Sequence, residues 1–393
     1  MESRVVRSSP DYLVLSDDER ARVAPALLNP IENRKSGLSL NHVIGCPLDC
    51  AYCVRHLFAN FQMKKPHALM SDEDAVALLL GHKFFRRQRT PIQIFNRATD
   101  PFLPDVKEHT FRVLRLLAAS GLSNHVLVIT RFVVTSDDAA RLNQFRPLKL
   151  TLLVTYSGID DKRVEPLGWI PASETLRLAF RAADSYRVVL YWRPIILGLN
   201  DSDDHIRRAA ALSHFAHATV FTGLFYRDAM REHYRDHDLA EPYTQTARRK
   251  ILPKILEQRL LPAFKAAGGG PLFRKTSCGV AFAHQEADFN GHFGIPEICD
   301  ICPVEQLRRC AAAFCRPSQE EVERLAREVG TTQHPEIDDR AITFDSLDEE
   351  PRYFIQHSLG YQVHDRRQPH HIRRHGRAEI GWGDGKDDEQ VDD

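Results

Sequence analysis

The chain has 393 residues, of which 43% are hydrophobic, so it can bury one large core and carry smaller modules beside it. Lys plus Arg and Asp plus Glu number 53 each, and this balance gives no overall field that would attract nucleic acid or a membrane surface. No long apolar run and no apolar N-terminal segment occur, so neither a membrane span nor a signal peptide is predicted. The eight cysteines are therefore expected to be thiols or metal ligands in a reducing cytoplasm.

Short apolar runs alternate with amphipathic stretches through the first part of the chain. We expect strands at 38–44, 92–95, 126–129, 148–154, 188–192 and 218–221. Helices are predicted from Ser71, which is a suitable N-cap, over 105–119, which Gly121 ends, and over 174–183. The strands lack alternation, so both faces of a parallel sheet should be covered. The pattern predicts an α/β fold, a partial (β/α)6 barrel with functional residues at the C-terminal strand ends.

A cysteine triplet follows the first predicted strand. Cys46, Cys50 and Cys53 have C-x3-C-x2-C spacing. Three thiolates can hold three corners of a cubane [4Fe–4S] cluster and leave its fourth iron open, whereas four protein ligands close a cluster for electron transfer. The alternatives are a zinc site, with His42 or His56 as the nearest fourth ligand, and a disulfide framework, which requires an oxidising compartment.

The triplet, with Tyr52 before its last cysteine, resembles the signature of the radical S-adenosylmethionine (SAM) enzymes. The resemblance implies that SAM chelates the open iron through its amino and carboxylate groups and is cleaved by one electron from the cluster. It further implies a 5′-deoxyadenosyl radical that abstracts a substrate hydrogen, sensitivity to oxygen, and a reducing partner such as flavodoxin or ferredoxin. The family's fold is also the partial barrel.

Several strings are similar to the DNA-repair-photolyase-like branch of that family, which includes the spore photoproduct lyases. They cover roughly residues 35 to 225 and lie at 37–41, 98–101, 127–130, 165–166 and 193–201. In the lyases a hydrogen-donating cysteine lies on the loop after the second strand. Here that loop reads Arg97-Ala-Thr-Asp100, and no cysteine occurs between Cys53 and Cys278. This departure puts thymine-dimer repair in doubt as the specific activity.

Polar residues at the strand ends are expected to face the barrel cavity. Small hydroxyls and one acid suit the ribose and amino groups of SAM, which makes these residues candidates for cofactor binding. The alternative is that the segment 99–102 forms an ordinary turn, because Asp before Pro favours turns. The candidates are Thr99, Asp100, Thr155, Ser157 and Arg193.

A second cysteine set lies late in the chain. We predict that Cys278, Cys299, Cys302 and Cys310 bind an auxiliary [4Fe–4S] cluster. Cys315 is an alternative to Cys310 as the fourth ligand. A closed structural zinc site is the other interpretation, because C-x2-C pairs are its usual spacing. The nearby polar segment 283–293 either faces substrate or is a solvated turn that holds the cluster loop; its candidates are His284, Asp288, Asn290 and His292.

The C-terminal part begins with a capping box of Ser318 and Glu321, which predicts a helix that ends before Gly330. A second helix is expected within 344–360. The run 366–377 holds five arginines and three histidines and either binds phosphate or is solvated surface. The expected parts are an N-terminal extension (1–30), the barrel (31–228), a metal-binding extension (229–317), a helical and basic segment (318–382) and a disordered acidic tail (383–393).

The sequence therefore predicts a radical SAM enzyme with a probable second cluster and a small-molecule or nucleotide-like substrate. A radical SAM enzyme that acts on nucleic acid is the first alternative, and the lyase-like core and the arginine run favour it. A non-enzymatic zinc protein, in which both cysteine sets are structural, is the second.

Overall fold

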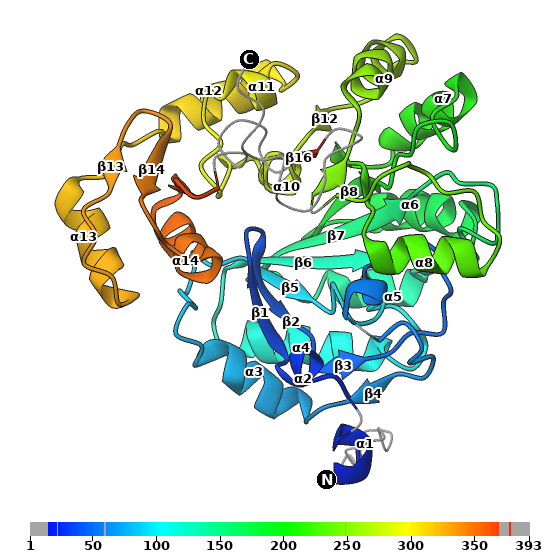
Figure 1. Ribbon diagram of the computed structural model, residues 1–393, viewed down its shortest axis with the longest axis horizontal. Helices are drawn as coiled ribbons and strands as arrows, with labels where there is room; N and C mark the ends of the chain where they lie inside the picture. The colour runs from blue at the N-terminus through cyan, green and yellow to red at the C-terminus, as the bar shows by residue number, and fades with distance from the viewer. Residues whose placement is uncertain (1–14, 22, 59, 248, 369–376, 379–393) are drawn as a thin grey trace, which may run out of the picture.

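The computed structural model describes residues 15–21, 23–58, 60–247, 249–368 and 377–378. An eight-stranded sheet forms its centre, in the order β1-β2-β5-β6-β7-β8-β9-β12 (Figure 1). Every neighbouring pair from β2 to β12 is parallel, and β1 joins β2 in an antiparallel hairpin. The bounds are β1 (Ile31–Arg34), β2 (Gly37–Leu40), β5 (Ile92–Ile94), β6 (His125–Thr130), β7 (Lys149–Tyr156), β8 (Arg187–Trp192), β9 (Ala218–Phe221) and β12 (Leu272–Phe273). The predicted α/β class and parallel sheet are confirmed.

Helices connect these strands and cover the outer face of the sheet (Figure 1). Three of the helices have an N-cap residue: the side-chain oxygens of Ser71, Thr135 and Ser202 each accept a hydrogen bond from a backbone N–H of the first turn. The helices on this face are α3 (Asp72–Leu80), α4 (Lys107–Ala119), α5 (Ser136–Leu142), α6 (Ile170–Ala182), α7 (Asp203–Ser213) and α9 (Lys254–Ala266). In contrast, α8 (Asp228–Asp236) packs beside the cysteine loop, where Met230 and Tyr234 share a core with Tyr52.

Side chains that alternate along the strands enter two different cores. Val126 and Val128 of β6 belong to the large outer core, together with residues of α3, α4, α6, α7 and α9. Leu127 of the same strand points the other way and packs with Val280 of helix α10 (Thr276–Ala283). The cysteine-rich region is therefore no loose appendage, because its first helix fills the inner face of the barrel sheet.

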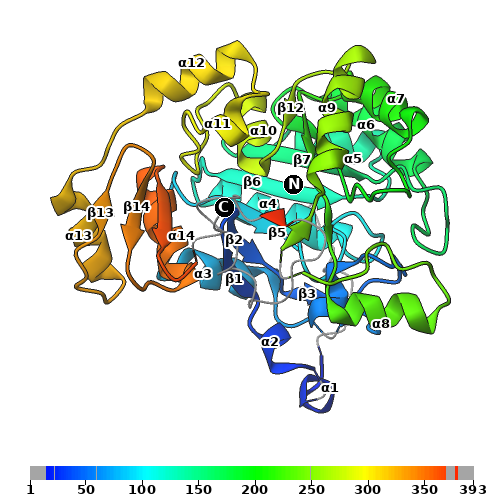
Figure 2. The same cartoon turned by 45° about the horizontal axis from the view of Figure 1, so that its top comes forward.

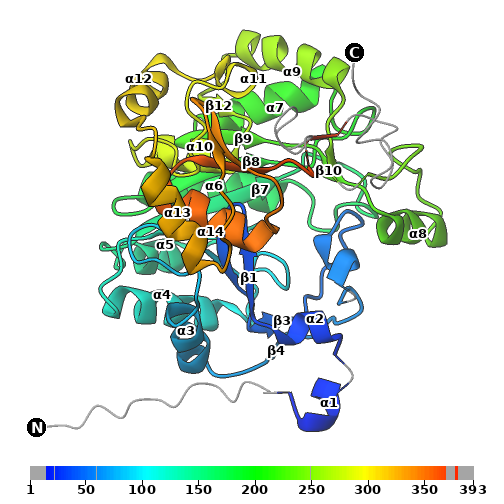
Figure 3. The ribbon, with the colours of Figure 1, turned by 60° about the vertical axis from the view of Figure 1, so that its left-hand side comes forward.

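The remaining C-terminal elements follow α10, and the helix at 349–359 among them lies beside the β1–β2 hairpin (Figures 2 and 3). Asn33 Nδ2 donates to the Glu350 carbonyl over 2.9 Å, and the His357 ring lies 3.0 Å from the Lys35 carbonyl. These elements are α11 (Pro296–Cys299), α12 (Val304–Ala313), α13 (Gln319–Glu328), β13 (Glu336–Ile337), β14 (Ala341–Phe344), α14 (Glu349–Leu359) and β15 (Gln362–Asp365). Ser318 caps α13 as predicted, and Gly360 ends α14 in a left-handed conformation.

The first predicted strand is interrupted before the cysteines. It divides into β2 and β3 (Val43–Ile44), and β3 pairs with β4 (His67–Ala68) outside the main sheet. Between them, the Asn41 N–H binds the Pro30 carbonyl and the His42 carbonyl accepts from Leu69. These non-sheet partners carry the chain away from β5, so the cysteine loop starts from a short ribbon at the edge of the barrel mouth.

Smaller elements complete the described chain. They are α1 (Asp17–Ala21), α2 (Pro25–Leu28), the 3-10 turn η1 (Val54–Phe58), β10 (Leu224–Phe225), β11 (Lys250–Ile251) and β16 (Arg377–Ala378). Most of the basic run and the acidic tail lie outside the described residues. Two arginines of the run pair with acids, Arg366 with Glu336 and Asp345, and Arg367 with Asp365. Within the described part, no helix has the length and apolarity needed to cross a bilayer.

Candidate functional site

The cysteine loop is held tightly at its start. Gly45 has a φ of +100°, and a Cβ at this position would lie 2.3 Å from the Lys65 carbonyl oxygen, so glycine is required. The Cys46 N–H then donates to the Met63 carbonyl over 2.8 Å. Arg55 is buried, and its guanidinium donates to the carbonyls of residues 48, 60, 61 and 63. A single cation thus closes the loop around the thiols.

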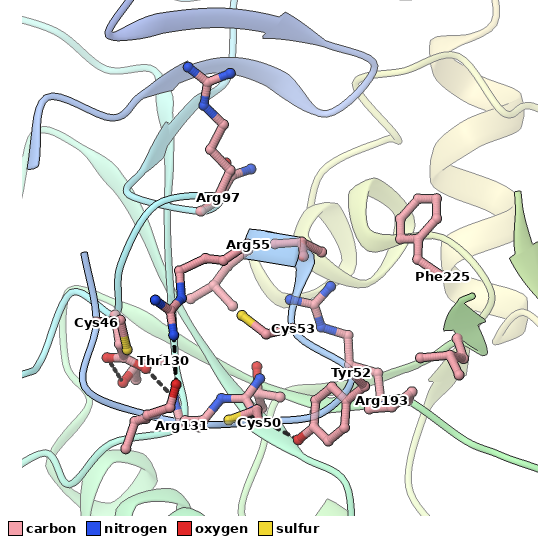
Figure 4. Close-up of a pocket in the computed structure, with 18 of the residues that line it drawn as sticks. Cys46, Cys50, Tyr52, Cys53, Arg55, Arg97, Thr130, Arg131, Arg193 and Phe225 are labelled. Atoms are coloured by element: carbon pink, nitrogen blue, oxygen red, sulfur yellow. Dashed lines mark hydrogen bonds between the residues drawn. The ribbon is translucent and has the colours of Figure 1, made fainter. Parts of the chain in front are cut away.

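The three thiols of the triplet converge at one end of a cavity (Figure 4). Cys46 and Cys50 are buried, Cys53 is half-buried, and their charges interact. Burial raises the pKa of the Cys46 and Cys50 thiols, so their thiolates need a bound cation. The three sulfurs do not all lie within 4.8 Å of one another. Ligands of one tetrahedral zinc would be about 3.8 Å apart, given Zn–S bonds of about 2.3 Å, so the wider arrangement suits a cluster.

The alternative zinc ligands lie outside the cavity beside the thiols. The His42 ring is buried and binds Asp72 over 2.7 Å, and His109 binds the same carboxylate oxygen over 2.8 Å. The His56 ring stacks on Phe61 with 3.7 Å between the centroids. Neither histidine lines the cavity into which the three thiols point.

Arg131, at the end of β6, joins the triplet to an acidic group. Its guanidinium donates to Cys50 Sγ over 3.3 Å, to Tyr52 Oη over 2.5 Å and to Glu165 Oε2 over 3.1 Å. Tyr52 and Ser157 both donate to Glu165, which is buried. Charges on Cys50, Tyr52 and Glu165 outweigh the cost of burial and raise the pKa of Arg131, so it stays protonated beside the thiols.

The cavity beside the triplet collects most of the predicted cofactor residues. Thr99, Asp100, Thr155 and Arg193 line it. Thr155 and Arg193 lie at the C-terminal ends of β7 and β8, and Thr99 and Asp100 lie on the loop that follows β5. Ser157 is not among the lining residues, because its hydroxyl binds Glu165 over 3.2 Å. The strand ends therefore bring four of the five candidates together.

Two of these residues differ in what they leave available for a ligand. Both Asp100 oxygens are occupied: Oδ1 accepts from Thr130 Oγ1 and Phe102 N, and Oδ2 accepts from Arg131 N. The bond to Phe102 is that of a turn, so the turn interpretation of this segment also holds. In contrast, Thr99 Oγ1 is buried and has no partner among the described residues. An unpartnered buried hydroxyl in a polar cavity fits a ligand with hydrogen-bonding groups.

The second cysteine set converges as well. Cys278 lies in α10, Cys299 ends α11, Cys302 follows it and Cys310 lies in α12. Cys302 is close enough to the other three for their charges to interact. Cys315 is exposed, and its sulfur lies 3.9 Å from the Arg316 carbonyl oxygen. The geometry therefore groups Cys310, and not Cys315, with the other three thiols.

The polar segment next to this set is folded into the interior. Asp288, Asn290 and His292 are buried, so the segment is not a solvated turn. Ligand atoms of Cys278, Asp288 and His292 all lie within 4.8 Å of one another, and His292 Nδ1 is 2.9 Å from Asp288 Oδ2. His284 binds Thr151 Oγ1 over 2.9 Å at the start of β7. None of these four candidates lines the cavity beside the triplet.

Three residues of the site were not predicted from sequence patterns. Arg55, Arg131 and Glu165 make the hydrogen bonds that organise the triplet, although Arg55 and Glu165 are 110 positions apart in the sequence. Glu165 lies in the noted pair 165–166, and Arg131 directly follows the noted string 127–130. A charged residue at the end of a buried strand is the signal that would have identified Arg131.

No protein-family model and no curated sequence matches the chain. A spore photoproduct lyase mutant aligns with a TM-score of 0.46 and 13% identity over 67% of this chain and 86% of that chain. Spore photoproduct lyase complexed with dinucleoside spore photoproduct aligns at 0.45 and 13%, over 62% and 77%. Native anSMEcpe with bound AdoMet aligns at 0.36 and 12%, over 58% and 59%. Function is therefore inferred from the site itself.

Proposed function

We propose that the protein is a radical SAM enzyme. The observation that carries this proposal is the set of three thiols at the mouth of a parallel barrel, on one wall of a cavity that Thr99, Thr155 and Arg193 also line. Cys46, Cys50 and Cys53 would hold a [4Fe–4S] cluster, and the cavity would hold SAM. When bound, this pair supplies one-electron cleavage of SAM and a carbon radical that removes a substrate hydrogen.

The chain's own residues have three tasks in this site. Arg55 and Gly45 shape the loop, so that the thiols present their sulfurs from one side. Arg131 donates to Cys50 Sγ and offsets negative charge in a region of low dielectric. Thr99 and Thr155 offer hydroxyls to polar groups of the ligand, and the apolar Ile129 and Leu224 in the same wall exclude water.

The second thiol set is proposed to bind an auxiliary [4Fe–4S] cluster through Cys278, Cys299, Cys302 and Cys310. These four cysteines lie in or next to three different helices and are close enough for their charges to interact, which supports one closed site. The charges of Cys299 and Cys302 interact, and burial raises the pKa of Cys278, which again calls for a cation. A reduced flavodoxin or ferredoxin would be the electron source for such an enzyme.

The test is anaerobic reconstitution followed by iron counting and a SAM-cleavage assay. The wild-type chain should bind about eight irons and release 5′-deoxyadenosine with dithionite and SAM, because the proposal assigns it two four-iron clusters. Cys50→Ala should lose about half of the total iron and all cleavage of SAM. Cys278→Ala should also lose about half of the total iron, in this case from the second thiol set.

Cys315→Ala is the matched control, because this exposed thiol lies apart from both sets. It should keep the iron content and the activity of the wild-type chain. Cleavage that persists in Cys50→Ala would refute the radical SAM assignment. About four irons together with one zinc per chain would refute the second cluster and leave the first intact.

A further inference from the structure

A second cavity adjoins the one beside the triplet. The two cavities share six lining residues, Val54, Asn96, Ile129, Arg193, Phe225 and Lys250. From there the second cavity extends to Lys275 and Thr276, at the start of α10, which carries Cys278. It therefore lies between the two thiol sets, where a substrate would have to be placed.

The walls of this second cavity are strongly basic. Among the described residues, seven Arg and Lys line it and no Asp or Glu does. Two of the cations are compensated from outside the wall: Arg34 pairs with Glu32, and Arg274 pairs with Glu257 and Asp300. Arg249 and Lys275 interact with other residues as well, and the remaining cations of the wall are Lys35, Arg193 and Lys250.

Three of these cations have no acidic partner within ion-pairing distance among the described residues. Lys35 Nζ binds the neutral amide of Gln362 over 3.1 Å. Arg193 lies over the Tyr191 ring at 4.0 Å, and Lys250 lies 5.3 Å from the centre of the Phe225 ring. Positive groups gathered at low dielectric without counter-charge cost free energy, which a bound anion would recover.

The pKa values of two titratable groups in the wall are lowered by the same excess of positive charge. Burial opposes ionisation of the Tyr191 hydroxyl, yet Arg193, Lys250 and the bond to Thr276 bring its pKa down to about 8. The pKa of Lys35 falls to about 8, because burial and the cations Arg352 and Arg249 outweigh the attraction of Asp288. The cavity thus favours a negative group before any ligand is considered.

Aromatic rings in the same wall add a second kind of contact. Tyr191, Phe225 and Tyr353 line the cavity, and Phe225 also borders the space beside the triplet (Figure 4). Arginine and aromatic faces are the surfaces on which planar rings stack. The combination of unpaired cations with aromatic rings in one cavity matches a ligand that carries both phosphate and a flat ring.

We propose that this basic cavity binds the substrate, and that the substrate is a small phosphorylated compound with a planar ring, of the nucleotide class. The proposal rests on the proposed function in one respect: the cavity is taken to present its ligand to the SAM site. A small ligand is favoured over a nucleic-acid strand, because the cations gather in a cavity between two thiol sets and the chain has no net charge.

Binding to the anaerobically reconstituted protein tests the proposal by isothermal titration calorimetry. The probes are a nucleoside, its 5′-monophosphate and 5′-triphosphate, inorganic pyrophosphate, and a single strand of about ten nucleotides. The triphosphate should bind more tightly than the monophosphate, the nucleoside should not bind measurably, and added salt should weaken binding. Lys35→Met and Lys250→Met should each weaken triphosphate binding about tenfold or more.

The exposed Lys162 provides the matched control, because Lys162→Met removes the same charge outside the cavity and should leave the affinity unchanged. Equal binding of nucleoside and nucleotide, or unchanged affinity in both cavity variants, overturns the proposal. Pyrophosphate that binds as tightly as the triphosphate overturns the assignment of a ring, and a single strand that binds more tightly overturns the assignment of a small ligand.

This measurement is independent of SAM cleavage, so the two proposals fail separately. Nucleotide binding without any 5′-deoxyadenosine would retain the anion site and remove the proposed enzyme function. Cleavage of SAM without nucleotide binding would retain the enzyme function and remove the assigned substrate class.

Discussion

Arg131 is the residue on which the organisation of the triplet depends most. Its guanidinium is about four-fifths buried, with 18% side-chain exposure, and its partner Glu165 is 4% exposed. A buried ion pair adds little net stability, because both charges are desolvated, but removal of one partner leaves the other charge buried and uncompensated. Tyr52 and Ser157 donate to Glu165 and reduce this cost without cancelling the negative charge.

We therefore expect Arg131→Met to lower the free energy of unfolding by about 3–5 kcal/mol. The double variant Arg131→Met with Glu165→Gln should recover a substantial part of that loss, because the unpaired carboxylate is gone. Urea unfolding of the cluster-free protein, followed by circular dichroism, measures both effects. Equal stability of the single variant and the wild-type chain would show that the pair is not buried in solution.

At the scale of single elements, α10 decides how the cysteine-rich region joins the barrel. The helix packs on the inner face of β8 and β9, and Gly279 faces β9 so closely that a Cβ would lie 2.4 Å from Val220 Cγ2. Valine has a stiff, branched side chain that moves little within a strand. A glycine in the middle of a helix usually costs stability, so close packing is the physical reason for its presence here.

Gly279→Ala should destabilise the protein by about 1–3 kcal/mol, although alanine favours the helix, because the added methyl overpacks the interface. The substitution should also lower iron content at the second thiol set, since Cys278 precedes this position. Combining it with Val220→Ala should restore part of the stability. Gly81→Ala is the control: its Cβ would meet nothing closer than 3.4 Å, so thermal unfolding should be nearly unchanged.

The whole molecule contains several histidines that are buried in their neutral form. Burial lowers the pKa of His284 to about 3 and of His357 to about 4, and it lowers the pKa values of His42, His125 and His217 as well. In the unfolded chain these side chains titrate near pH 6.5. Below that pH the unfolded state binds more protons than the folded state, so protonation favours unfolding.

The thermal midpoint should therefore be nearly constant above about pH 7 and should fall steadily from about pH 6.5 towards pH 4. His357→Gln should give a shallower fall, because one group with a lowered pKa has been removed. His214→Gln, which changes an exposed histidine, should follow the wild-type curve. A midpoint that rises on acidification would contradict the burial of these neutral rings.

The sequence by itself determined the class of fold and the first thiol site. Apolar strands at 126–129 and 148–154 were recognised as parallel and doubly covered, because hydrophobic pattern and helix caps act within a few residues. The structure extends these strands to β6 and β7 and keeps their order. The triplet needed no tertiary information, because its three thiols lie on one loop.

Only the tertiary structure decided which distant side chains meet. It places Arg131 and Glu165 against Cys50, groups Cys310 rather than Cys315 with the second set, and turns α10 into the barrel. It also gathers the seven cations of the basic cavity from four separate segments, 34–35, 193, 249–250 and 274–275. Contacts between such segments depend on how the whole core packs, and no local spacing or propensity encodes them.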